Sequence, residues 1–127
     1  MVVKFAQWTL DVHNVGLMAE FWSQALGYRI AHGADGNAKL YPPDDAEVDV
    51  PTMWLQASAE PKRDKNRNHP DLRPVDGDVD GEVARLLGLG ASHADVGQTS
   101  ADPFVVLVDP EGNEFCVLRR DPRTSTA

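Results

Sequence analysis

The residue types that could do chemistry in this chain stand at alternate positions of strand-like segments. His69 and Asp71 are two residues apart, and so are Glu114 and Cys116. Alternate side chains of a strand point to the same face, so each pair is predicted to share one. Histidine and carboxylate groups can bind a metal ion or exchange protons, and a cysteine can bind zinc as thiolate. The two pairs indicate a ligand or metal site on a sheet face.

The first half of the chain offers a matching set of polar and aromatic residues. Gln7 and Thr9 alternate in one strand-like segment, and Trp54 and Gln56 alternate in another. Trp54 is the tryptophan expected in a cavity, where its ring could stack on a flat ligand. Arg67 and Lys65, close to His69 in sequence, could anchor a carboxylate or phosphate, with exposed loop charge as the equal alternative.

Each of these residues also has a plainer interpretation. The polar face could simply be exposed to solvent, as in many half-buried antiparallel sheets. His69 could be a hydrogen-bonded pocket histidine or a structural one. Cys116 could be a small buried apolar residue rather than a nucleophile.

Two helices are predicted from apolar residues at helical spacing. Asn14 is a suitable N-cap for the first helix, and Gly27 stands where a glycine commonly ends one. Asp78 or Asp80 can cap the second, and Gly90 can end it. The apolar stripes are Leu17, Met18, Phe21, Trp22, Ala25 and Leu26 in the first helix, and Val79, Val83, Leu86 and Leu87 in the second.

Strand-like segments surround both helices in the same order. One precedes each helix and three follow it, so each half is predicted to be a βαβββ module with one face of its sheet under the helix. A glycine-containing turn, 109–113, is typical of a hairpin between the last two strands. The predicted strands are 5–12, 28–31, 38–41 and 52–57 in the first half, and 68–73, 92–96, 104–108 and 114–119 in the second.

Length and composition place the chain among ordinary globular domains. The 127 residues are 42% hydrophobic and 25% charged, and one domain of that length can bury a core without disulfides. We expect a single domain over 1–120, with modules at about 3–57 and 68–120, followed by a flexible tail at 121–127.

Charge and hydropathy exclude several classes of partner. A net charge of −8 disfavours nucleic acid, and no apolar run has the length of a membrane span. The N-terminal sequence lacks a signal-peptide pattern, so a cytoplasmic location is expected. The single cysteine, Cys116, has no partner for an internal disulfide.

Three motifs in order around this duplication resemble a glyoxalase-like domain of the vicinal-oxygen-chelate superfamily, which includes glyoxalase I, bleomycin-resistance proteins and extradiol dioxygenases. They are FWSQALGY (21–28), the run 60–73 with its basic residues and histidine, and VDPEGNEFCVL (108–118). The resemblance implies an α+β fold in which two βαβββ modules form a curled mixed sheet around a cavity. It also implies a homodimer.

In metal-using members, the first and last strands of each module supply the ligands. Carried over, these positions are Gln7, then Trp54 or Gln56, then His69, then Cys116. Metal-binding members have glutamate where this chain has Cys116, and Glu114 precedes that position by two residues. A Zn, Fe, Ni or Mn ion could bind through His69 together with Gln7 and with Glu114 or Cys116, but an intact catalytic metal centre is not expected.

The resemblance and the residues together predict a protein that binds a small planar or anionic molecule without a catalytic metal. One alternative is a metal-dependent lyase, isomerase or dioxygenase, and another is a non-catalytic structural or regulatory module. The predicted pocket residues are Gln7, Thr9, Trp54, Gln56, Arg67, His69, Asp71, Glu114 and Cys116.

Overall fold

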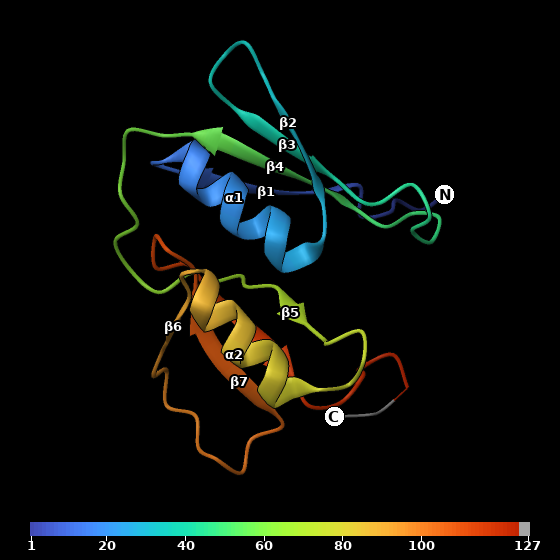
Figure 1. The fold of residues 1–127 in the computed structure, drawn as a ribbon, viewed down its shortest axis with the longest axis vertical. Coiled ribbons are helices and arrows are strands. Elements are labelled where there is room, and N and C mark those ends of the chain that lie inside the picture. Colours follow the sequence, from blue (N-terminus) through green and yellow to red (C-terminus); the bar gives the residue numbers. More distant parts are fainter. Residues whose placement is uncertain (125–127) are drawn as a thin grey trace. The chain divides into compact units, whose positions relative to one another are not determined.

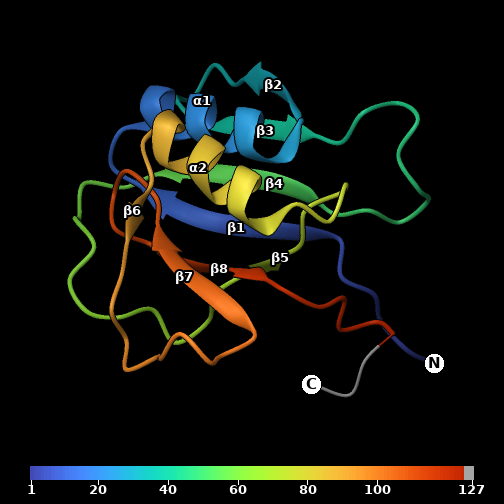
Figure 2. The same ribbon diagram turned by 60° about the horizontal axis from the view of Figure 1, so that its bottom comes forward.

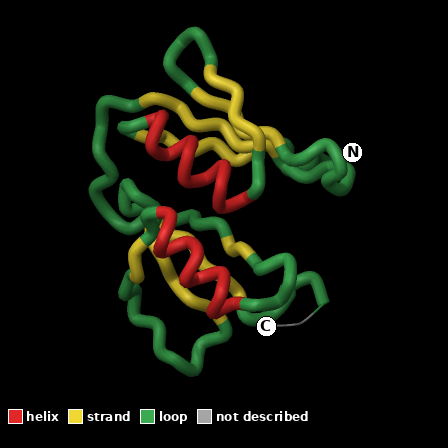
Figure 3. Tube along the Cα trace, viewed as in Figure 1, coloured by secondary structure: helices red, strands yellow, loops and turns green. Residues whose placement is uncertain are grey.

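A computed structural model of the chain describes residues 1–124, and its backbone divides into two compact units (Figure 1). The N-terminal unit is Met1–Pro61 and the C-terminal unit is Lys62–Ala127. In each unit one helix lies beside one sheet (Figure 3). Of the predicted tail, 121–124 forms a turn in which the Asp121 carboxylate pairs with Arg123, whereas 125–127 lie outside the described residues.

The N-terminal unit contains β1 (Gln7–Val12), α1 (Val15–Leu26), β2 (Arg29–His32), β3 (Ala38–Tyr41) and β4 (Thr52–Ala57). Its strands lie in the order β1-β4-β3-β2, with β1 parallel to β4 and the other pairs antiparallel.

Local chemistry fixes both ends of α1 and the face that it buries. The Asn14 side chain accepts a hydrogen bond from the Leu17 N–H, and Gly27 ends the helix with a φ of 70°. Trp22 is fully buried and meets the edge of Trp8 from β1 at a centroid distance of 5.0 Å. Trp8 therefore faces the helix, which leaves the alternate residues of β1 on the opposite face of the sheet.

The C-terminal unit repeats this arrangement. It contains β5 (Asp71–Leu72), α2 (Val79–Leu89), β6 (Ser92–His93), β7 (Phe104–Val108) and β8 (Glu114–Leu118). The order is β5-β8-β7-β6, with β5 parallel to β8, and Figure 2 shows β7 and β8 side by side. The equal strand orders confirm two βαβββ modules in an α+β fold with two mixed four-stranded sheets.

The core of the C-terminal unit lies between α2 and one face of its sheet. Asp78 caps α2 by accepting a hydrogen bond from the Gly81 N–H at 2.9 Å. Val83 and Leu86 are the buried residues of the helix, and Phe115 and Val117 are the buried apolar residues of β8. As predicted, these alternate with Glu114 and Cys116, which face away from the helix.

Four strands are shorter than the sequence pattern predicts, among them the last, which ends at Leu118 rather than at residue 119. The first begins at Gln7 rather than at residue 5, the strand predicted at 68–73 is only Asp71–Leu72, and the strand predicted at 92–96 ends at His93. Pro70 has no N–H for the ladder, and the segment after His93 turns at Gly97, which has a φ of 93°. Neither helix within residues 1–124 has the length and apolar character needed to cross a membrane.

Candidate functional site

The pairing of β5 with β8 brings the chemically active residues of the C-terminal unit together. Asp71 lies directly opposite Cys116, and the Cys116 N–H donates to the Pro70 carbonyl at 3.0 Å. Because His69 precedes Asp71 by two residues, both side chains lie on the face that carries Cys116. A two-residue strand is thus sufficient to position the three groups.

A cavity of about 320 Å³ lies over this face, within the C-terminal unit. Its polar lining consists of Lys65, His69, Asp71, Glu114 and Cys116. The apolar lining is Val96, Phe104, Val106 and Leu118, so β7 and β8 supply most of the wall. An apolar hollow with a few polar groups is the usual form of a small-molecule site.

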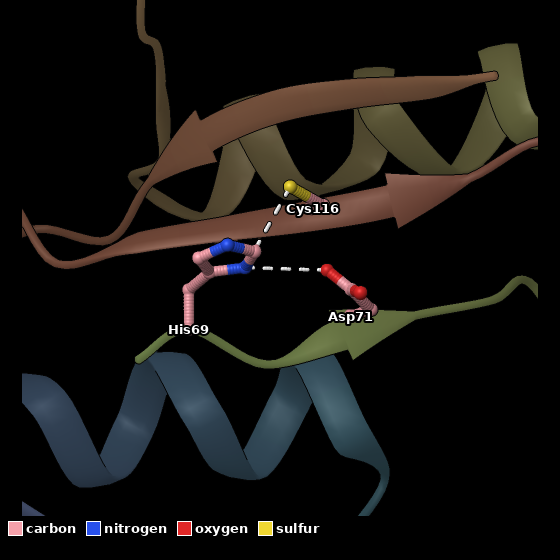
Figure 4. Close-up of side chains that lie close together, drawn as sticks. All are labelled: His69, Asp71 and Cys116. Carbon is pink, nitrogen blue, oxygen red and sulfur yellow. Dashed lines mark hydrogen bonds and ion pairs between the residues drawn. The ribbon is translucent and has the colours of Figure 1, made fainter. Parts of the chain in front are cut away.

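His69, Asp71 and Cys116, which all line the cavity, form a compact cluster (Figure 4). The Nδ1 atom of His69 is 3.2 Å from Oδ1 of Asp71 and 3.9 Å from the Cys116 sulfur. One ligand atom from each residue falls within 4.8 Å of the other two. In donor type and spacing, the cluster resembles a zinc site more than a site for a hard, oxygen-preferring ion.

The Cys116 thiol is held in its neutral form. Burial raises the pKa of Cys116 to about 11, the charge of Asp71 and a hydrogen bond to it add to the shift, and the charge of Lys65 opposes it. At neutral pH the group is therefore a thiol, which is a weak hydrogen-bond donor and a poor nucleophile.

Glu114 is already engaged by other groups of the same unit. The Lys62 ammonium donates to Oε1 at 2.7 Å, and the Asn66 N–H donates to Oε2 at 2.9 Å. Burial alone would raise the pKa of the Glu114 carboxyl, but hydrogen bonds from Lys62 and from the backbone outweigh it and hold the pKa below its ordinary value. We call Lys62, Asn66 and Glu114 the Glu114 clamp.

The clamp assigns Glu114 a role that differs from the predicted one. Both carboxylate oxygens accept hydrogen bonds, and within residues 1–124 the group of potential metal ligands comprises His69, Asp71 and Cys116 without Glu114. Asp71, which was predicted for the pocket but not for the metal set, belongs to this group, and a metal role for Glu114 stays a prediction.

The predicted residues of the first half share one face of the N-terminal sheet. Thr9 pairs with Trp54, and Gln7 pairs with Thr52, whose hydroxyl donates to the Gln7 side-chain oxygen at 3.0 Å. Trp54 is half-buried and Gln56 is exposed, and both point away from α1. The choice between these two for the pocket position stays open, and membership of Gln7, Thr9, Trp54 and Gln56 in a ligand pocket stays a prediction.

The residues that line the cavity are not all among those predicted for the pocket. Arg67 is exposed and does not belong to the lining found in the described part of the chain, whereas its neighbour Lys65 does. Phe104 and Val106 were missed, although their register opposite Leu118 and Cys116 follows from the predicted hairpin. No sequence signal pointed to the pairing of Lys62 with Glu114.

Comparison with known proteins identifies the fold family. The sequence model described as "Glyoxalase-like domain" matches residues 7–118, which is most of the chain. Among curated proteins, none matches the chain.

Solved structures share the fold at low sequence identity. The fosfomycin resistance protein FosX from Mesorhizobium loti has a TM-score of 0.74 at 14% identity, covering 95% of this chain and 94% of that one. A mutant FosX from Listeria monocytogenes, in complex with Mn(II) and a dihydroxypropylphosphonic acid, has a TM-score of 0.73 at 11% identity, covering 95% and 93%. A glyoxalase/bleomycin resistance protein from Albidiferax ferrireducens has a TM-score of 0.66 at 16% identity, covering 92% and 98%.

Proposed function

The chain belongs to the glyoxalase-like domain family of the vicinal-oxygen-chelate superfamily, and from this premise we propose that it binds a small, flat, mainly apolar molecule without a catalytic metal centre. The observation that supports this best is the cavity of about 320 Å³ in the C-terminal unit, with an apolar wall and His69, Asp71 and Cys116 among its polar groups.

In this proposal the residues of the polar cluster are paired with one another. Asp71 lies beside Nδ1 of His69 and is hydrogen-bonded to the Cys116 thiol, so each of the three groups has a partner from the protein itself. Such an arrangement satisfies the Asp71 carboxylate and the Cys116 thiol within the protein, so neither group needs an ion.

The Mn(II) ion bound by the Listeria FosX would find an unsuitable donor set here. Manganese prefers oxygen and nitrogen ligands, whereas Cys116 offers sulfur and Glu114 is held by Lys62 and Asn66. We therefore derive no catalytic step through such an ion.

The proposal is tested by closing the cavity. A fragment library is screened by ligand-observed NMR in the presence of a chelator, against the wild type and Val96→Trp. Val96 lines the cavity and is 41% exposed, so a larger ring can be accommodated at this position, where it should take up space that a ligand would use. Val75→Trp is the matched control, because Val75 is a 97% exposed valine of the same unit that does not line this cavity.

We expect fragments that bind the wild type and Val75→Trp but not Val96→Trp. Hits that bind all three proteins equally would place the binding elsewhere, and the absence of any hit would contradict the proposal.

A second candidate function is a zinc-dependent member of the superfamily, and the close approach of three different donors favours it. His69, Asp71 and Cys116 would hold the ion, which would polarise an oxygen of the substrate. Cobalt titration distinguishes the two functions, because a cobalt–thiolate bond gives an intense near-ultraviolet absorption band. A stoichiometric band in wild type and Glu114→Gln, lost in Cys116→Ala, would support the zinc site, and its absence would support the metal-free proposal.

The remaining expectations, a homodimer and a cytoplasmic location, stay predictions.

A further inference from the structure

The two ring nitrogens of His69 have different environments. Nδ1 lies beside the Asp71 carboxylate at 3.2 Å and beside the Cys116 sulfur at 3.9 Å. Figure 4 shows the second nitrogen on the side of the ring turned away from Asp71. Within the part of the chain that the structure describes, no hydrogen bond or ion pair engages that Nε2 atom, although His69 lines the cavity.

The position of Asp71 determines the tautomer of the neutral ring. A carboxylate next to one imidazole nitrogen favours the proton on that nitrogen, because its negative charge attracts the N–H dipole. The neutral ring then carries its proton on Nδ1 and a lone pair on Nε2. At the cavity lining, His69 therefore offers a hydrogen-bond acceptor that no group within residues 1–124 engages.

The charge around the cluster disfavours an anionic group at the same place. Asp71 carries a negative charge beside His69, and the positive charge of Lys62 is already matched by Glu114. Among the described residues, Lys65 is the remaining cation of the cavity lining, and its charge reaches Cys116, where the opposing charge of Asp71 has the larger effect. A neutral donor avoids repulsion from Asp71 and satisfies the Nε2 lone pair.

We propose that the cavity selects neutral aromatic molecules that carry one hydroxyl group, the phenol class, with the hydroxyl donating to Nε2 of His69 and the ring lying against Phe104 and Val106. This rests on the proposed function and adds the class of ligand to it. Asp71 is a positioning residue here, because it sets the tautomer of His69 and does not touch the ligand.

A matched ligand series tests the selection. β-Naphthol, its methyl ether and β-naphthoate share one ring system and differ in offering a donor, no donor, or a negative charge. Their affinities are measured by isothermal titration at about pH 8 with a chelator present. A hydrogen bond contributes about 1 kcal/mol, so β-naphthol is expected to bind about threefold to tenfold more tightly than the ether.

Variants connect that preference to the residues. His69→Phe should bind the ether and the naphthol equally, whereas His93→Phe, a change at an exposed histidine of the same unit, should keep the preference. In the wild type, nitrogen NMR should show the proton of His69 on Nδ1, and the Nε2 signal should shift on adding naphthol but not ether. In Asp71→Asn the tautomer ratio should change, which a purely structural role of Asp71 would not cause.

Different outcomes would count against the ligand class and against the binding function itself. Equal affinities of wild type for naphthol and ether, or tightest binding of the naphthoate, would overturn the inference and leave the binding function intact. Loss of binding by all three compounds would count against both.

Discussion

The Glu114 clamp provides the sharpest test of how the cavity wall is held. In Lys62→Met the carboxylate of Glu114 stays in place, with a side chain that is only 8% exposed, but loses its cationic partner. Removing one partner of a buried pair leaves an uncompensated charge, which is strongly destabilising. The methionine keeps the length and apolar body of the lysine, so the change acts mainly on the charge.

The magnitude follows from the burial of the pair. Fully buried pairs lose about 3–5 kcal/mol when one partner is removed. Here the Lys62 side chain is 18% exposed and backbone donors still reach Glu114, so we expect a loss of about 2–3 kcal/mol in the free energy of unfolding. Lys4→Met is the control, because Lys4 pairs with Asp49 at a similar distance while both are largely exposed, and such pairs contribute under about 1 kcal/mol.

The assay must report on the C-terminal unit. The three tryptophans, Trp8, Trp22 and Trp54, all belong to the N-terminal unit, so their fluorescence reports on that unit. Urea unfolding is therefore followed by far-ultraviolet circular dichroism together with the NMR amide signals of β8 and of Asn66. Loss of the clamp should lower the urea midpoint of the β8 signals.

Lowering the pH should reduce the stability that the clamp contributes. The pKa of Glu114 is lowered in the folded state, so the clamp contributes fully above the ordinary carboxyl pKa and its contribution is lost as the pH falls through the folded value. The difference between wild type and Lys62→Met should shrink over that range. A Lys62→Met cost no larger than that of Lys4→Met, or a cost independent of pH across the carboxyl range, would refute the reasoning.

Four further predictions concern the thiol, the glycines and the last hairpin. Native Cys116 should react with iodoacetamide at about pH 8 about a hundredfold more slowly than the urea-unfolded thiol, and Asp71→Asn should speed the reaction; equal native and unfolded rates would contradict the raised pKa. Because the pKa of Cys116 is raised in the folded state, the thiol's contribution to stability is complete below pH 9.0 and is lost as the pH rises to about 11. Alkaline unfolding should therefore show the difference between wild type and Cys116→Ala changing over that pH range. Gly27 has a φ of 70°, so Gly27→Ala should lower the stability measured by thermal unfolding by about 1 kcal/mol. Gly16 lies inside α1, so Gly16→Ala should raise the stability by about 0.5 kcal/mol. A Gly27→Ala variant as stable as the wild type would contradict the left-handed cap. Asp109→Ala should cost about 2 kcal/mol in urea unfolding, because this buried carboxylate accepts the N–H groups of its own turn, and a loss below about 0.5 kcal/mol would contradict that role.

The fold could be predicted because two local patterns, the capped apolar stripe of a helix and the alternation of a strand, occur in both halves of the chain. Helix caps and apolar stripes located α1 and α2, with Asn14 and Asp78 at the starts and Gly27 and Gly90 at the ends. Alternation then assigned the two faces of the strands. The strands at 38–41, 52–57 and 104–108 have the predicted bounds, whereas the segment around Pro70 is shorter, because a proline limits the ladder.

The candidate site was only partly predictable, because it depends on contacts between residues that are far apart in the sequence. Alternation brought His69 to the face of Asp71 and Glu114 to the face of Cys116, but it did not define which of these groups meet. The approach of Lys62 to Glu114 depends on the path of an irregular loop, and no periodicity encodes such a path. The sequence therefore predicted Glu114 as a pocket residue and possible metal ligand, but not as the partner of a lysine.

The central claim, that the cavity of the C-terminal unit binds a small aromatic molecule, is tested most directly by amide NMR of the wild type during a β-naphthol titration with a chelator present. The account predicts saturable shifts concentrated at His69, Asp71 and Cys116 and along β7, with the same signals unmoved in Val96→Trp. Shifts confined to the N-terminal unit, or no saturable shift in either unit, would contradict it.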